Sequence, residues 1–260
     1  PTNHFELFFG KSIRWFLSGF KEAIFSFSKS SFCSAFASSA TVATDSDVLF
    51  SSKLFDLSII SSIGKLGVEL FVLDDGWFGS RNDDHQALGD YDVNRKKLPG
   101  GLDGLANNIH KMGMKFGLWF EPEMVNPDSD LYRAHPDWVL GLAHVEQVPF
   151  RNQLVLDISR PEVSDYLFER IDAVLRDHDI IYVKWDMNRD LSHPGDSSGV
   201  PRAFAQVGAL YALLDRVRDA HPHVEIESCS SGGARADMGV LAHSDRVWTS
   251  ASNDALDRQV

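Results

Sequence analysis

The chain has 260 residues, 43% of them hydrophobic, and a formal net charge of −12. This length suits one large domain with a full core. The negative charge argues against nucleic acid as a partner, because binding to a phosphate backbone depends on Lys and Arg. Two cysteines, Cys33 and Cys229, allow no disulfide framework, and no uncharged apolar run reaches the roughly 18 residues of a membrane helix. We expect a folded protein without a nucleic acid or membrane partner, with a cytoplasmic location favoured.

The composition changes near residue 63, and residues 1–50 form an atypical segment rich in Ser and Phe. Residues 16–40 show neither helical nor strand periodicity, and charged side chains interrupt the apolar core that a signal peptide needs. An insertion or an artefact explains this segment better than a targeting peptide, although "NHFELFF" at 3–9 could be a remnant first strand. We therefore divide the chain into residues 1–50 and a partial catalytic domain at 51–260.

A regular pattern begins after the first segment. Apolar spacing predicts a helix that ends near Gly64 or Gly67, and the apolar run at 68–74 predicts a buried strand. Helix-like segments then alternate with further apolar runs, which predict strands at 115–120, 154–157, 180–186, 224–229 and 246–250. This alternation indicates a parallel sheet wound by helices.

A polar cluster follows each of these apolar runs. Polar groups at the ends of many strands favour a (β/α)8 TIM barrel over a doubly wound sheet, which gathers its site at one switch point. No Gly-rich phosphate motif follows the first strands, which weakens a nucleotide-binding alternative. Because the chain stops after the seventh expected strand, we expect a barrel that is incomplete at its C-terminus, with the eighth strand missing.

The stretch "YVKWDMNRD" is the most informative of these strand ends. Side chains alternate along a strand, so Tyr182, Lys184, Asp186 and Asn188 are expected on one face. The Lys184 charge would favour an ionised Asp186, which a carboxylate nucleophile requires at neutral pH. A purely structural ion pair at the strand end remains the alternative.

The stretch "FVLDDGWFG" places Asp74 and Asp75 at the end of an earlier strand, with Trp77 close behind. Adjacent acids can accept hydrogen bonds from vicinal hydroxyls, and an indole offers a face to a sugar ring. The same acids could bind a hard metal ion or cap a helix. The pattern alone does not decide between sugar and metal.

Other polar residues follow the remaining strands. Glu121 and Glu123 are expected in supporting or structural roles. The guanidinium group of Arg151 could donate two charge-assisted hydrogen bonds to a ligand or to one of the acids. Cys229 lacks an evident histidine partner and is disfavoured as a nucleophile. Gly232 would let the backbone approach a ligand closely.

Taken in order, "LDDGWFG", "GLWFEPEMV", "KWDMNRD", "ESCSSGGARAD" and "VWTSASNDALDR" resemble the catalytic domain of glycoside hydrolase family 36, the α-galactosidases of the melibiase type. The motifs "DDGW" and "KWDMNR" distinguish this family from the sister family of lysosomal-type α-galactosidases, which has different motifs at these strand ends. The resemblance implies retaining hydrolysis of terminal α-D-galactosides such as melibiose and raffinose, without metal or cofactor, by full-length relatives that are homo-oligomers.

The resemblance also implies roles for individual residues. Asp186 matches the position of the nucleophile. The positions that hold the galactose hydroxyls or lie near the sugar are matched by Asp74, Asp75, Arg151, Lys184, Asn188, Cys229 and Gly232.

The acid/base position of the resemblance is occupied by alanine. In the family an Asp follows "WTS", and here that place is Ala251. Alternation along the last strand places Val247, Thr249 and Ala251 on one face, so Ala251 is expected to point into the barrel mouth if Thr249 does. Asp254 would have to fold back to replace the missing carboxyl group. We therefore expect impaired hydrolysis, with a non-catalytic galactoside-binding module or pseudoenzyme as the alternative.

Overall fold

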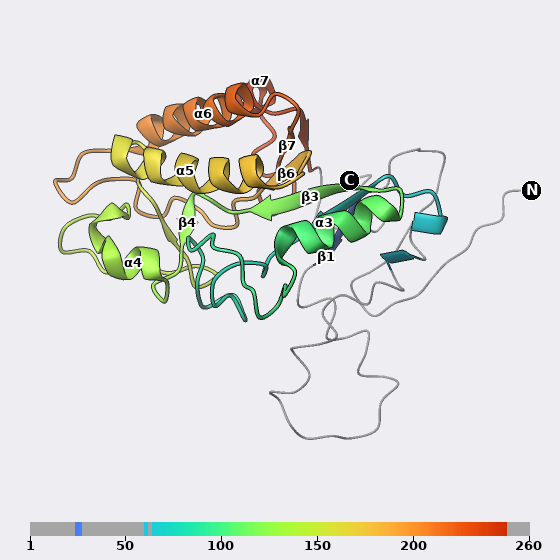
Figure 1. Ribbon diagram of the computed structural model, residues 1–260. Helices are drawn as coiled ribbons and strands as arrows, with labels where there is room; N and C mark the ends of the chain where they lie inside the picture. The colour runs from blue at the N-terminus through green and yellow to red at the C-terminus, as the bar shows by residue number, and fades with distance from the viewer. Residues whose placement is uncertain (1–23, 28–59, 62–63, 249–260) are drawn as a thin grey trace, which may run out of the picture.

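The computed structural model describes residues 24–27, 60–61 and 64–248 (Figure 1). Helical residues at 60–61 and 64–65 agree with the expected first helix, and the chain turns at 66–67. The elements that follow the chain are β1 (Ile24–Phe27), β2 (Leu70–Leu73), α3 (Gly101–Lys111), β3 (Lys115–Phe120), β4 (Met124–Val125), α4 (Asp130–Ala134), η1 (Pro136–Trp138), β5 (Leu154–Val155), α5 (Pro161–Asp177), β6 (Tyr182–Trp185), α6 (Ala203–Ala220), β7 (Glu225–Ser228), α7 (Met238–His243) and β8 (Arg246–Val247).

Six strands form one sheet in the order β1-β2-β3-β6-β7-β8, and every neighbouring pair is parallel. Four predicted strands are confirmed as β2, β3, β6 and β7. The predicted strand at 246–250 begins as β8, and its last two residues lie outside the described part of the chain. Within the described residues β1 and β8 are the sheet edges, so the barrel is not closed there.

Two expectations about the strands need correction. The run at 154–157 is not a strand of the main sheet, because Leu154–Val155 pairs antiparallel with Met124–Val125 in a separate two-stranded sheet. A short apolar run has no feature that distinguishes these two settings. A strand also occurs at Ile24–Phe27, where the sequence predicted no regular structure, and it pairs with β2. The expected first strand at 3–9 lies outside the described residues.

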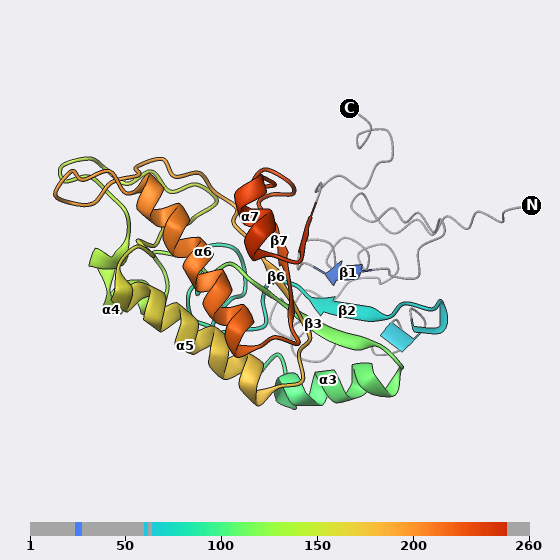
Figure 2. The ribbon, with the colours of Figure 1, turned by 90° about the horizontal axis from the view of Figure 1, so that it is seen from above.

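The helices cover the outside of the sheet because each has one apolar face. Figure 2 shows α5 and α6 side by side, with α3 beside the β3 end of the sheet. Along α5 the buried residues recur every three or four positions, as in an amphipathic helix; they are Val163, Leu167, Ile171, Val174 and Leu175. Helices α5 and α6 form the crossovers into β6 and β7, which orients the carboxyl ends of all these strands alike.

Gly117 sets the packing at the centre of the sheet. It pairs with Val72 on β2 and with Tyr182 on β6. A Cβ atom added at Gly117 would lie 2.9 Å from the Tyr182 Cβ and 3.1 Å from the Val72 Cγ2. The glycine therefore leaves the space that Tyr182 fills, and this brings the start of β6 into register with β3.

None of the helices described here is long and apolar enough to cross a bilayer. The buried hydrophobic residues form one cluster that extends from the region before β2 to α7. The polar clusters that follow β2, β3, β6 and β7 therefore lie together at one edge of the sheet, above this core.

Candidate active site

The sheet holds Asp186 and Cys229 by main-chain hydrogen bonds that continue past the ends of β6 and β7. The Asp186 N–H donates to the Phe120 carbonyl oxygen at 2.8 Å, and the Cys229 N–H donates to the Trp185 carbonyl oxygen at 2.8 Å. Both residues are buried. Their positions are therefore set by the rigid sheet and not by a free loop.

The Asp186 carboxylate accepts hydrogen bonds from three nitrogen donors. Its Oδ2 accepts from Trp119 Nε1 at 3.1 Å and from Asn188 Nδ2 at 2.7 Å. Its Oδ1 accepts from the Met187 N–H at 2.9 Å. The side chain is held in one orientation, yet 6% of the residue surface remains accessible.

Charge and hydrogen bonding together favour the ionised form of Asp186. Burial alone would raise its pKa, but the Lys184 charge and the hydrogen bonds from Asn188, Cys229 and Trp119 lower the pKa below its ordinary value. The predicted effect of Lys184 on Asp186 is confirmed in direction.

Lys184 forms its ion pair with Asp74, since its Nζ lies 3.0 Å from Asp74 Oδ2. Burial would lower the pKa of Lys184, but the charges of Asp74 and Asp186 raise it above its ordinary value. The ammonium group therefore stays charged. It also lies 5.3 Å from the ring centroid of Trp248, which is within cation–π range.

Asp75 is paired with a residue that the sequence did not single out. Arg81 donates to Asp75 through Nε at 2.9 Å and Nη2 at 2.8 Å, and its Nη1 donates to Asn126 Oδ1 at 2.8 Å. Arg81 is 3% exposed. Its position six residues after Asp75 carries no periodic signal, so only the folded loop reveals the pair.

The two open interpretations of Asp74 and Asp75 can now be compared. Each carboxylate already has a cation as partner, in Lys184 and Arg81 respectively. The described residues also contain no group of three or more His, Cys, Asp or Glu side chains placed to hold a metal ion. Each carboxylate is therefore held beside a cation, and the choice between hydroxyl acceptors and a metal site stays a prediction.

Trp77 does not have the position that a sugar platform requires. It is 2% exposed, and its Nε1 donates to the Trp119 carbonyl oxygen at 2.9 Å. Its ring packs against Tyr91 and Phe120 in the core. The prediction of an exposed indole at Trp77 is wrong, because the aromatic cluster behind β3 buries it.

Asn188 and Cys229 contact the Asp186 carboxylate, and Gly232 contacts Cys229 through its main chain. Asn188 Oδ1 accepts from Ser231 Oγ at 3.1 Å, so the loop after β7 supports the amide that contacts Asp186. Burial and the Asp186 charge raise the pKa of Cys229 to about 12, which keeps the thiol protonated and argues against a nucleophilic role. Gly232 has a φ of 102°, a conformation that favours glycine in this turn.

One predicted position, Arg151, is not brought into the site. Arg151 is exposed on the loop before β5, with a φ of 51°, and it makes no hydrogen bond or ion pair among the described residues. Ala251 and Asp254 lie outside the described residues.

The described end of β8 lies beside the site. Trp248 lies over Lys184, whereas Val247 packs against the hydrophobic core. Thr249 and Ala251, on which the expectation for the barrel mouth depends, lie outside the described residues.

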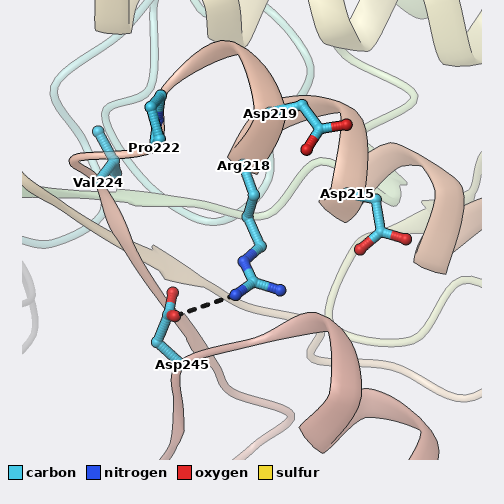
Figure 3. Close-up of a pocket in the computed structure, with 6 residues that line it drawn as sticks. All are labelled: Asp215, Arg218, Asp219, Pro222, Val224 and Asp245. Atoms are coloured by element: carbon cyan, nitrogen blue, oxygen red, sulfur yellow. Dashed lines mark hydrogen bonds and ion pairs between the residues drawn. The ribbon is translucent and has the colours of Figure 1, made fainter.

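A second polar region lies at the opposite, amino ends of β7 and β8 (Figure 3). This surface pocket has a volume of about 310 Å³ and is lined by Asp215, Arg218, Asp219, Pro222, Val224 and Asp245. Arg218 Nη2 lies 3.3 Å from Asp245 Oδ1. Asp245 also accepts the main-chain N–H of Ile226 at 2.8 Å, which ties the turn before β8 to β7.

Comparison with known proteins shows the family. Residues 49–260 match the Melibiase family. The α-galactosidase AgaA of Geobacillus stearothermophilus is 49% identical over 207 residues, which cover 78% of this chain and 28% of that protein. An α-galactosidase of Escherichia coli is 50% identical over 193 residues, 74% of this chain and 27% of that protein. The chain belongs to the melibiase family, whose relatives here are α-galactosidase glycoside hydrolases.

Solved structures agree with this assignment. The family 36 α-galactosidase AgaB of Geobacillus stearothermophilus matches with a TM-score of 0.76 at 49% identity, over 80% of this chain and 30% of that one. A variant of AgaA in complex with raffinose matches with a TM-score of 0.75 at 48% identity, over 78% of this chain and 29% of that one. The chain spans less than a third of the length of these relatives.

Proposed function

We propose that residues 51–260 are part of a (β/α)8 TIM-barrel catalytic domain that acts on terminal α-D-galactosides such as melibiose and raffinose by a retaining mechanism. In this proposal residues 1–50 are an atypical segment in front of the domain. The whole protein would assemble as a homo-oligomer. The reaction needs no metal or cofactor, because the proposed chemistry uses carboxyl groups alone.

The observation that carries this proposal is the environment of Asp186. Three donors orient its carboxylate, and the Lys184 charge lowers its pKa. A buried, ionised and oriented carboxylate at the carboxyl end of a parallel strand is suited to attack an anomeric carbon. A variant of the related α-galactosidase AgaA was solved in complex with raffinose, which supports the choice of substrate class.

The surrounding polar groups supply the binding part of the proposal. Asp74 and Asp75 act as acceptors for sugar hydroxyls, while Lys184 and Asn188 act as donors. Cys229 and Gly232 lie beside the same space. Arg151 could join them only if its exposed loop moves toward the site, and Trp77 supports the site from within the core.

In the proposed first step an oxygen of Asp186 forms a bond to the anomeric carbon as the bond to the leaving-group oxygen breaks. A second carboxyl group then normally protonates that oxygen and later activates water. Ala251 occupies the corresponding position here and has no proton to give. General acid/base catalysis contributes about 10² to 10⁴ in rate, so hydrolysis of natural galactosides by this chain is expected to be impaired.

The substitution Ala251→Asp tests this proposal. It restores a carboxyl group, and we expect melibiose hydrolysis to rise by about 10²-fold or more, measured as galactose released. The parent chain should still release dinitrophenolate rapidly from a 2,4-dinitrophenyl α-galactoside, because that leaving group needs no proton, and added azide should speed release of the sugar from Asp186. Normal melibiose hydrolysis by the parent chain would contradict the role assigned to position 251.

The alternative is a galactoside-binding module or pseudoenzyme, which the missing carboxyl group at Ala251 favours. In that case galactose binds, Asp186 never forms a covalent adduct, and Ala251→Asp gains no activity. Mass spectrometry of the chain after exposure to the dinitrophenyl galactoside separates the two functions, since only the enzyme gains the mass of one galactosyl group. A cooperative thermal melt by circular dichroism is the control for folding.

A further inference from the structure

Glu121 is a buried carboxyl group that binds two separate segments of the chain. It directly follows β3 and is 1% exposed. Its Oε1 accepts the main-chain N–H of Asn188 at 2.6 Å, and its Oε2 accepts Nε2 of Gln153 at 2.9 Å. Both oxygens are therefore occupied by groups that come from the β6 end and from the β5 hairpin.

The hydrogen bond to Asn188 matters because β6 has already ended. Sheet hydrogen bonding continues only to the Asp186 N–H, and the Met187 N–H turns back to Asp186 Oδ1. Glu121 is the acceptor for the next N–H, that of Asn188. It thereby fixes the main-chain position from which the Asn188 amide reaches Asp186 Oδ2 at 2.7 Å.

The neighbouring charges indicate how Glu121 performs this task. Burial, and then the charge of Asp186, raise the pKa of Glu121 to about 8, with Asp75 raising it further and the Asn188 N–H and Arg81 lowering it. At neutral pH the group then carries a proton. A neutral carboxyl group still accepts the Asn188 N–H through its carbonyl oxygen, and it adds no second negative charge beside Asp186.

The Gln153 side-chain amide can accept a hydrogen bond from the protonated Glu121 carboxyl group. Its Oε1 is buried without a hydrogen-bond partner. Because amide oxygen and nitrogen can exchange places by a flip, the Glu121 hydroxyl could donate to the Gln153 oxygen. Arg189 also donates to the Gln153 main-chain oxygen. Gln153 is therefore connected to the segment from Asp186 to Arg189 twice, directly by Arg189 and through Glu121 by the Asn188 N–H.

We propose that Glu121 is a positioning residue for the reaction of Asp186: through the main-chain N–H of Asn188 it holds the Asn188 amide against the attacking carboxylate. This inference rests on the proposed function, in which Asp186 is the nucleophile. It distinguishes Glu121 from the equally buried Glu123, which instead accepts from Trp185 Nε1 and pairs with Arg235.

The test measures the first chemical step in the full chain by the fast release of dinitrophenolate, which needs no group at position 251. Glu121→Ala removes the acceptor, and misplacement of a reacting group by about 1 Å costs about 10²-fold, so we expect a loss of that size. Galactose affinity should change less than threefold. Glu121→Gln keeps an acceptor for Asn188 and should restore the rate to within about threefold of the parent.

Asp245→Ala is the matched control. Asp245 also accepts a main-chain N–H, that of Ile226, but at the opposite end of the sheet. We expect the Asp245→Ala substitution to lower the melting temperature, while the rate of dinitrophenolate release changes less than threefold. An equal rate loss in Asp245→Ala and Glu121→Ala would overturn the positioning role, because general loosening would then account for both.

Further outcomes separate this inference from the proposed function. If the parent chain releases no dinitrophenolate, the proposed function fails and the inference fails with it. If the parent reacts and Glu121→Ala reacts equally fast, only the inference is overturned. Should Glu121→Ala not fold, Gln153→Leu decides: a loss of about tenfold supports the positioning role, and an unchanged rate overturns it.

Discussion

Carboxylates lie at both ends of the sheet, but their surroundings differ. At the carboxyl ends, Asp186 is almost fully buried and accepts three hydrogen bonds from fixed donors. At the amino ends, Asp215 and Asp245 are partly exposed and pair with His243 and Arg218. The same side chain is therefore prepared for reaction at one end and serves mainly to connect elements at the other. Desolvation and the number of fixed donors make this difference.

Asp186→Asn should have the largest effect, because the amide cannot attack the anomeric carbon. We expect the rate of dinitrophenolate release to fall by about 10⁴-fold or more, the range found when a nucleophile is removed. The amide keeps the size of the carboxylate, so folding should be retained. Asp245→Asn at the other end of the sheet is the control and should leave the rate unchanged. Equal rates for the two variants would contradict the difference between the two ends.

Lys184→Met should have the next largest effect. It removes the charge that lowers the pKa of Asp186, while burial, which raises that pKa, remains. The nucleophile then protonates at a higher pH, so the acidic limb of the pH–rate profile moves upward. We expect a loss of about 10²-fold at pH 5 that is smaller at pH 8. Lys184→Arg keeps the charge and should leave the acidic limb near its original position; a limb that moves equally in both variants would contradict this account.

Sequence patterns predicted the strands that carry the site more reliably than the contacts within it. The polar motifs at the ends of β2, β6 and β7 predicted that Asp74, Asp186 and Cys229 lie close together, because strand ends in a parallel sheet meet at one edge. Alternation also placed Lys184 and Asp186 on one face. These are properties of short segments, which a single sequence contains.

Contacts between distant segments could not be predicted in this way. Both faces of β3 are buried, so "KFGLWF" does not show which face contains Trp119 and Glu121. The burial of Trp77 depends on aromatic rings from other segments, and the antiparallel pairing of Leu154–Val155 depends on β4. The sequence around Arg81 does not predict its ion pair with Asp75, because only the folded loop brings the two side chains together.

Arg81→Met should destabilise the carboxyl end without removing a reacting group. It leaves the Asp75 carboxylate and the Asn126 amide oxygen without their donor. Breaking a buried pair costs about 3–5 kcal/mol, and because Asp75 is 27% exposed we expect a smaller loss of about 2 kcal/mol in the free energy of unfolding. Arg133→Met is the control, since Arg133 is 54% exposed in its pairs with Asp128 and Asp130. Urea unfolding should show a clearly smaller loss there; equal losses would contradict the importance of burial.

Arg218→Ala should have the smallest effect, because its pair with Asp245 lies at the partly exposed amino end (Figure 3). The side chains are 36% and 33% exposed, and the Nη2 to Oδ1 distance is 3.3 Å. Pairs of this kind contribute about 0–1 kcal/mol and weaken with salt. We expect urea unfolding to show a loss below about 1 kcal/mol that decreases further at high salt, with no change in dinitrophenolate release. A loss as large as that of Arg81→Met would show that the two ends of the sheet do not differ in the way their carboxylates are held.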